Sequence, residues 1–235
     1  MKQTISGAIC LSLAASIWGG MYVVSKYVLD FIPPLTLVWL RFIIAFVVLY
    51  GILKLAEKKQ KKKVTIRKKD WLLFAWIGFI GYFISITCQF IGTKLSDAHT
   101  GSLVTSATPA FMVIFAALIL KEKLTARRLL STIIATIGVI IVIGWDIEIG
   151  SYFIGTIILV EAAITWALLS IYVKIASIQF SSLVITTYAI FFSLFFITPF
   201  MIWELQAASI GTVNTYVILG VLYLGIVSTA GAFFL

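Results

Sequence analysis

The segment GTIILVEAAITWALLSIYVK, residues 155–174, repeats the pattern of an earlier segment, GAICLSLAASIWGGMYVVSK, residues 7–26. The two segments align without a gap, and the matches include Gly7 with Gly155, Ala14 with Ala162, Ala15 with Ala163, Trp18 with Trp166, and Lys26 with Lys174. Apolar helices share alanines by chance, but a tryptophan and a lysine at the same spacing are a more specific signal. We therefore interpret the chain as an internal duplication.

The composition places these segments in a membrane. Of the 235 residues, 62% are hydrophobic and 11% are charged, and the mean hydropathy is +1.13. The apolar runs have the length of about 20 residues that an α-helix needs to cross a hydrocarbon layer of roughly 30 Å. The sequence predicts eight such helices. They cover approximately residues 5–29, 34–55, 71–93, 99–120, 127–145, 152–175, 181–203 and 213–235.

The net charge of +9 is distributed unevenly across the predicted membrane. With the N-terminus in the cytoplasm, the Lys and Arg residues toward the outside are Lys26, Arg41 and Lys94, and the acidic residues of the outer loops are Asp30, Asp97, Asp146, Glu148 and Glu204. This positive-inside pattern predicts a multi-pass protein of the cytoplasmic membrane. The basic loop from Lys58 to Lys69 is expected to contact anionic lipids, and it is too short to read a nucleic acid.

The duplication is predicted to be inverted. Five predicted helices separate the starts of the two copies, and an odd number makes the second copy enter from the opposite face of the membrane. Lys26 and Lys174 accordingly end their helices on opposite sides, where snorkelling to the interface accounts for both. A weaker match of GYFIS, from Gly81, with GIVST, from Gly225, pairs the third helix with the eighth. Inverted repeats around a midplane site are typical of secondary transporters.

The repeat also divides the chain. Residues 1–146 form a first repeat of five helices, and residues 152–235 form an incomplete second repeat of three. The fold class is therefore an all-α polytopic membrane protein with two inverted five-helix repeats, of which eight helices are present. We expect a complete protein of this kind to run to roughly 290 residues, so the chain is expected to be truncated at its C-terminus.

Several motifs resemble the EamA-type members of the drug/metabolite transporter superfamily. SIWGGMYVVSKYV is similar to the first helix of that family, and IPPLTLVWLRF to its second. The most specific stretch is SLVTSATPAFMVIFAALILKEKLTARRLLSTIIATIGVIIV, residues 102–142, with Pro109, Glu122, Gly138 and Val139 at the family's positions. The resemblance implies ten helices in two inverted repeats and carrier-mediated movement of small metabolites or drugs, usually outward.

Glu161 is the most conspicuous candidate for a functional site. It lies near the middle of its predicted helix, where an ionised carboxylate facing lipid costs about 2.5 to 3.5 kcal/mol, so it is expected to face the bundle. Thr165 and Tyr172 share its face. Glu161 either exchanges a proton or holds a cationic substrate; alternatively, it is a protonated carboxyl group that packs against a neighbouring helix.

Other candidates for substrate or proton binding are small polar or aromatic residues on the remaining helices: Ser85, Gln89, Ser106, Trp18 and Trp166. Small polar residues at helical spacing serve close helix packing as readily as ligand binding. Pro109 is expected to kink or interrupt the fourth helix, and with Gly19 and Gly20 it is a candidate hinge.

Three further polar residues have alternative interpretations. Asp97 is a candidate N-cap of the fourth helix, and His99 behind it serves the surface or the cap, or else a proton relay. Arg41 lies about two turns inside the second helix. It either snorkels outward or bonds carbonyl groups near Pro33 and Pro34, or else it binds an anion.

The sequence lacks the parts of an enzyme. It contains no HExxH motif, no paired intramembrane aspartates and no glycine-rich phosphate loop, so no cofactor or metal is expected. The function predicted is a secondary transporter that exports small metabolites or drugs by alternating access, with or without coupling to protons. The alternative is a membrane sensor, a binding protein or a passive channel. Amino acids, nucleosides and lipophilic cations all remain candidate substrates, and the protein is expected to be a monomer or homodimer.

Overall fold

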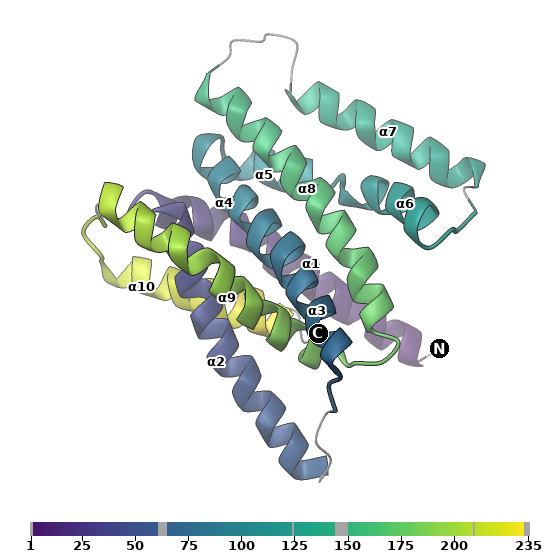
Figure 1. Ribbon diagram of the computed structural model, residues 1–235. Coiled ribbons are helices and arrows are strands. Elements are labelled where there is room, and N and C mark those ends of the chain that lie inside the picture. The colour runs from purple at the N-terminus through teal and green to yellow at the C-terminus, as the bar shows by residue number, and fades with distance from the viewer. Residues whose placement is uncertain (1, 61–64, 124, 144–149, 209, 233–235) are drawn as a thin grey trace.

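The computed structural model describes residues 2–60, 65–123, 125–143, 150–208 and 210–232, and these residues form helices and no β-strand. The predicted all-α class is therefore confirmed, and Figure 1 shows the helices packed side by side in one bundle. In chain order the elements are α1 (Lys2–Leu29), α2 (Pro34–Gln60), α3 (Lys68–Ile77), η1 (Gly78–Ser85), α4 (Ile86–Leu95), α5 (Ala98–Thr105), α6 (Thr108–Ile119), α7 (Ala126–Ile143), α8 (Ser151–Ala176), α9 (Ser182–Ala207), α10 (Thr215–Leu222) and η2 (Tyr223–Gly231).

Within the described residues, each of the eight predicted spans contains helix, but three of them are not simple α-helices. Residues 144–145 of the fifth predicted span and 233–235 of the eighth lie outside the described residues. The third span consists of α3, η1 and α4, in which η1 is a π-helical segment. The eighth span consists of α10 followed by the π-helical segment η2. The fourth span is divided into α5 and α6.

The helices have the length and apolar character of membrane spans. Five spans within the described ranges are long and apolar enough to cross a bilayer: Pro34–Lys59, Lys68–Leu95, Ala98–Ile119, Ser151–Ala176 and Ser182–Ala207. The helix α7 lies at one edge of the bundle in Figure 1, and large apolar side chains such as those of Leu130 and Ile134 are exposed on it. Together with the composition, these spans identify a multi-pass membrane protein.

The interruption that Pro109 predicts is present. α5 ends at Thr105 and α6 begins at Thr108, with Pro109 in the first turn of α6, where its missing N–H leaves no hydrogen bond unmade. The predicted cap at the other end of α5 is also confirmed, because the carboxylate of Asp97 accepts a hydrogen bond from the backbone N–H of Thr100 at 2.8 Å. His99 is exposed beside this cap.

Glu204 lies in the last turn of α9 and is buried, so its assignment to an outer loop was wrong. Its carboxylate accepts hydrogen bonds from the backbone N–H groups of Leu35 at 3.1 Å and Thr36 at 2.7 Å, and from the Thr36 hydroxyl at 2.8 Å. These N–H groups belong to the first turn of α2 and have no acceptor within their own helix. Glu204 therefore caps α2 from a distant helix, where the helix dipole also favours a negative charge.

The two π-helical segments pack reciprocally across the chain. η1 lies against α9, and η2 lies against α2. A Cβ atom added at Gly78 would lie 2.4 Å from the carbonyl oxygen of Ala189, and one added at Gly225 would lie 2.7 Å from Cγ2 of Ile44 and 3.2 Å from the carbonyl oxygen of Arg41. Glycine is therefore required for both close approaches.

The charged ends of the helices are only partly described. α2 carries Lys58 and Lys59 in its last turn. Arg67, just before α3, forms an ion pair with Asp70 at 3.2 Å. Several residues used to predict the orientation lie outside the described residues, namely Lys61, Lys62, Lys63, Asp146 and Glu148.

Candidate functional site

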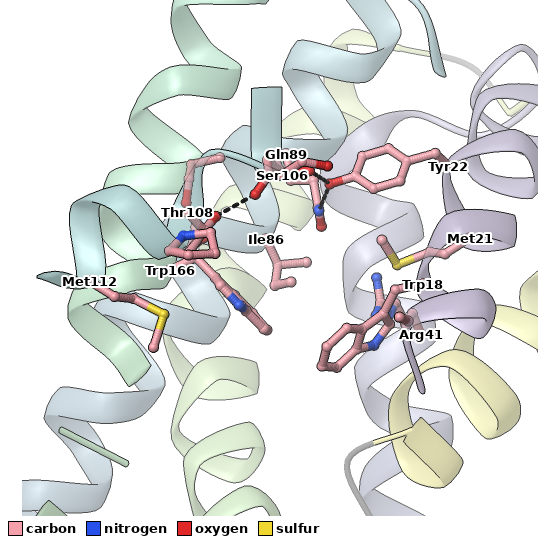
Figure 2. Close-up of a pocket in the computed structure, with 15 residues that line it drawn as sticks. Trp18, Met21, Tyr22, Arg41, Ile86, Gln89, Ser106, Thr108, Met112 and Trp166 are labelled. Carbon is pink, nitrogen blue, oxygen red and sulfur yellow. Dashed lines mark hydrogen bonds between the residues drawn. The ribbon is translucent and has the colours of Figure 1, made fainter. Parts of the chain in front are cut away.

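A cavity of about 470 Å³ lies among α1, α2, η1, α4, α5, α6 and α8. Its size falls within the range of small-molecule sites in proteins. Figure 2 shows Trp18 and Arg41 on one side of the cavity, Trp166 and Met112 on the other, and Tyr22, Gln89 and Ser106 grouped at one end. The lining residues are Ala15, Trp18, Met21, Tyr22, Arg41, Ser85, Ile86, Gln89, Thr105, Ser106, Thr108, Pro109, Met112, Ala162 and Trp166.

A short hydrogen-bonded chain crosses one end of the cavity. The amide Nε2 of Gln89 donates to the hydroxyl of Tyr22, and that hydroxyl lies 2.6 Å from the hydroxyl of Thr105. The Thr105 hydroxyl donates in turn to the carbonyl oxygen of Gly101 at 2.7 Å. The other amide atom of Gln89, Oε1, is buried without a hydrogen-bond partner. It is therefore an acceptor that a ligand could use.

The two tryptophans form the aromatic part of the wall. Trp18 of α1 and Trp166 of α8 contact each other edge to face, with ring centroids 6.2 Å apart and an interplanar angle of 85°. The indole N–H of Trp18 donates to the carbonyl oxygen of Ser228 in η2 at 3.3 Å. Tyr82 of η1 supports Trp166 from another side, at 6.4 Å between centroids. The orientation of both indoles is thus fixed by neighbouring helices.

Arg41 of α2 does not snorkel. Its side chain is only 1% exposed, its Nε donates to the hydroxyl of Thr229 at 2.5 Å, and its guanidinium carbon lies 5.3 Å from the ring centroid of Phe90. Nη1 is buried and has no hydrogen-bond partner. The cavity wall therefore contains a buried cation with an unused donor.

The structure brings together most of the small polar and aromatic candidates. Trp18, Ser85, Gln89, Ser106 and Trp166 all line the cavity, although they come from separate regions of the chain. The hydroxyl of Ser85 donates to a backbone carbonyl of α8 at 2.7 Å, and that of Ser106, just past the end of α5, donates to the carbonyl oxygen of Ser102 in that helix. Pro109 lines the cavity at the start of α6.

The other candidates lie away from this cavity. Glu161 faces α4, where its carboxyl group is hydrogen-bonded with the thiol of Cys88 while its Oε2 is buried without a partner. Thr165 donates to the backbone carbonyl of Glu161 at 2.9 Å, and the ring of Tyr172 packs against Trp76 at 6.1 Å. The proposed hinge glycines, Gly19 and Gly20, lie inside the uninterrupted α1.

Several cavity residues were not assigned to the site from the sequence, and Tyr22 and Met112 are two of them. Tyr22 follows Trp18 by about one helical turn and lies on the same face of α1, so this spacing could have predicted that Tyr22 lines the cavity. Met112 follows Pro109 by three residues on α6 and could have been found in the same way. The role of Arg41 was left open, because the sequence does not show which groups surround it.

The two lysines of the repeat contact different partners at opposite ends of the bundle. The ammonium group of Lys26 donates to the carbonyl oxygens of Thr93 at 3.0 Å, Lys94 at 2.9 Å and Ser96 at 2.7 Å. These carbonyl groups end α4, where the helix dipole favours a cation. Lys26 therefore fastens the end of α1 to the end of α4.

Lys174 lies at the end of α8 and forms an ion pair with Glu122 at 2.8 Å. Arg128 contacts the same carboxylate at 3.0 Å. The hydrogen bond from Lys174, followed by that from Arg128, holds the pKa of Glu122 below its ordinary value of 4.5. This group of three charges joins α8 to the segment between α6 and α7.

Comparison with known proteins relates the chain to a family of transporters. The model of the EamA-like transporter family matches residues 5–144. The uncharacterized transporter YetK of Bacillus subtilis strain 168 is 28% identical over 239 residues, which cover 100% of this chain and 72% of YetK. The uncharacterized inner membrane transporter YhbE of Escherichia coli K12 is 28% identical over 177 residues, which cover 71% of this chain and 53% of YhbE.

A solved structure has the same fold. The crystal structure of a protein with 19% sequence identity superposes with a TM-score of 0.67, covering 97% of this chain and 77% of that chain. At this identity the likeness concerns the fold alone. The chain spans about half the length of YhbE and of an uncharacterized transporter of Archaeoglobus fulgidus, of which 53% and 46% are covered.

Proposed function

Because this chain belongs to the EamA-like transporter family, we propose that it is a secondary transporter that exports small metabolites or drugs across the cytoplasmic membrane by alternating access. The observation that carries the proposal is a cavity inside the bundle, lined by helices from both copies of the repeated segment. α1 contributes Trp18 and α8 contributes Trp166, and these are equivalent positions of the repeat.

The inverted repeat, with residues 1–146 and 152–235 as its two parts, is the basis of the alternating-access proposal. It is supported by the place of the π-helical segments, since η1 and η2 both lie in the third helix of their respective repeats. It is also supported by reciprocal packing, in which the second helix of each repeat packs against the third helix of the other. Two such halves can exchange inward-open and outward-open shapes at similar energy.

The contacts of α1 support entry of the substrate into the cavity from the cytoplasmic side. Its C-terminal end is fastened to α4 through Lys26, whereas Ser12 and Ser16 in its N-terminal half are exposed, and a Cβ added at Gly19 would meet nothing within 4 Å. In the proposed orientation, with a cytoplasmic N-terminus, the closed end faces outward. A cavity accessible from the cytoplasm suits an exporter.

Glu161 is the residue proposed for coupling to protons. Its Oε2 is buried in the membrane interior without a partner, and a bound proton would neutralise the carboxylate and supply a hydrogen-bond donor. Because Glu161 lies outside the cavity lining, we propose that it acts through α4, where it contacts Cys88, rather than by touching the substrate. Thr165 and Tyr172 would then support α8 rather than bind substrate.

The proposed surroundings of the transporter are the bilayer and its lipids. The basic stretch from Lys58 to Lys69 is proposed to contact anionic headgroups on the cytoplasmic side. The protein is proposed to act as a monomer or homodimer.

Flux in sealed vesicles tests the function. The full-length protein would be reconstituted in proteoliposomes and supplied with a panel of labelled amino acids, nucleosides, organic acids and lipophilic cations, with and without an imposed pH gradient. We expect saturable flux of at least one class, dependence on the gradient, and loss of that dependence in Glu161→Gln with flux itself retained. Glu57→Gln, at the cytoplasmic end of α2, is the control.

The outcomes separate the alternatives. Binding without flux in any condition would favour a sensor or binding protein, and flux that never saturates would favour a channel. Equal flux with and without the gradient would remove Glu161 from a coupling role while leaving the transport proposal intact.

A further inference from the structure

Arg41 places a positive charge in the wall of the cavity without a matching negative charge. Its Nε is used by Thr229, but Nη1 is buried and without a hydrogen-bond partner. The face of the Phe90 ring supplies a cation–π contact, which is weaker than a charged hydrogen bond. A buried guanidinium with an unused N–H donor is costly unless an acceptor pairs with it.

Most acidic residues of the described chain have partners other than Arg41. Ion pairs join Lys54 with Glu57, Arg67 with Asp70, and Glu122 with both Arg128 and Lys174. The carboxylate of Glu204 caps α2, and that of Glu161 faces Cys88 outside the cavity lining. Within the described ranges, therefore, no carboxylate pairs with Arg41, and the charge is available to a ligand.

The rest of the lining restricts what that ligand can be. Among the fifteen lining residues Arg41 is the only charged side chain, so a single negative charge is matched. A guanidinium fits a carboxylate through two parallel N–H···O bonds. Trp18 and Trp166 offer aromatic surface to an apolar body, and Oε1 of Gln89 offers an acceptor to an N–H or O–H group.

We propose that the cavity selects a substrate that carries one carboxylate, paired with Arg41, and an apolar body that lies against Trp18 and Trp166. The inference rests on the transport function proposed above and names the substrate class for it. It favours organic monocarboxylates over nucleosides and over lipophilic cations, which Arg41 would repel.

Binding of three probes with the same apolar body tests the proposal. Phenylacetate carries the carboxylate, its methyl ester is neutral, and phenethylamine is a cation. Isothermal titration calorimetry on the purified chain in detergent is expected to rank phenylacetate above the other two. Arg41→Gln is expected to weaken phenylacetate binding about 10- to 100-fold, as the loss of a charge-assisted pair does, and to leave the ester unchanged.

Two further variants separate binding from folding. Arg41→Lys keeps the charge without the planar fork, and we expect intermediate affinity for phenylacetate. Arg127→Gln, on the exposed start of α7, removes a charge outside the cavity and is expected to bind like the wild type. Circular dichroism and thermal unfolding establish that each variant is folded.

Several results would overturn the inference. If Arg41 only holds helices together, Arg41→Gln would lower the melting temperature while phenylacetate kept its preference over the ester. If Arg41→Gln does not fold, the test is the order of affinities of the wild type for the three probes. Tighter binding of phenethylamine or of the ester than of phenylacetate would refute the proposal. Carboxylate binding without flux by the full-length protein would refute transport but keep the carboxylate site at Arg41. Flux restricted to cations would support transport but refute that site.

Discussion

Trp18 and Trp166, which occupy the same position in the two copies of the repeated segment, contact each other edge to face inside the bundle, with ring centroids 6.2 Å apart. Residues related by a two-fold operation can touch only where they lie close to its axis. The contact therefore places the proposed pseudo-symmetry axis beside the cavity that both indoles line. A substrate bound there would meet similar surfaces from both halves of the chain.

The tryptophan pair is expected to contribute coupled stability. Trp18→Leu and Trp166→Leu should each destabilise the protein, and the double variant should lose less than the sum by about 0.5 to 1.5 kcal/mol, because an edge-to-face pair is worth that much beyond its buried area. Denaturant unfolding of the four proteins in detergent measures this coupling. Strict additivity would show that the indoles do not depend on each other.

Removal of the Glu204 carboxylate should weaken the start of α2. Glu204→Leu leaves the N–H groups of Leu35 and Thr36 without their acceptor, and we expect a loss of about 1 to 2 kcal/mol, as for other helix caps. Thermal unfolding measures the effect. Gln206→Leu, exposed in the same turn of α9, is the matched control and should change stability little.

The glycines at the π-helical segments should not tolerate a methyl group. In Gly78→Ala the new Cβ would lie 2.4 Å from a backbone oxygen, and backbone cannot move aside as a flexible side chain can. We expect a loss of about 1 to 3 kcal/mol. Gly51→Ala has open space around its Cβ and should be neutral or slightly stabilising. If the melting temperatures of Gly78→Ala and Gly51→Ala were nearly equal, that result would contradict the close approach of η1 and α9.

The charge group around Glu122 predicts a dependence on pH. Since the pKa of Glu122 is lowered by Lys174 and then Arg128, its contribution to stability is present above 4.5 and is lost as the pH falls through the lowered value. Glu122→Gln should therefore melt below the wild type at about pH 6, and the two should converge at about pH 3. A constant difference across that range would show that the carboxylate is not paired. The effect is expected to be small, because the group is exposed.

Site-directed labelling tests the inverted arrangement. With Cys10 and Cys88 replaced by serine, a cysteine at Asp30, just beyond α1, should react with a membrane-impermeant maleimide from outside the cell. A cysteine in place of Lys174 should react from the cytoplasmic side only. Labelling of both positions from the same side would refute the inverted orientation of the two repeats, and the alternating-access proposal that depends on it.

The helices could be read from the sequence because their apolar runs are long and their ends carry local signals. Pro109 and Asp97 fixed an interruption and a cap, since both act within a few residues of their own position. The π-helical segments η1 and η2 could not be predicted in this way, because their packing depends on helices distant in the sequence.

The candidate site was predicted only in part, for a related reason. Gln89, Trp18 and Trp166 were found because their residue types stand out among apolar neighbours. Glu161 stands out equally, yet it lies outside the cavity, since the direction it faces depends on how α8 is rotated against α4. Arg41 and Glu204 acquire their roles from partners far along the chain, Thr229 for the first and the start of α2 for the second.

The glycine contacts at Gly78 and Gly225 have a mechanical consequence. Two helix pairs whose main chains touch have almost no freedom to slide, so α2 with η2 and α9 with η1 each behave as a stiff unit. Any large rearrangement must then be absorbed where the chain is least constrained by its own ladder of hydrogen bonds. The break between α5 and α6 is such a place, because Pro109 has no N–H with which to continue the ladder, and Ser106 and Pro109 both line the cavity that a passing molecule would touch.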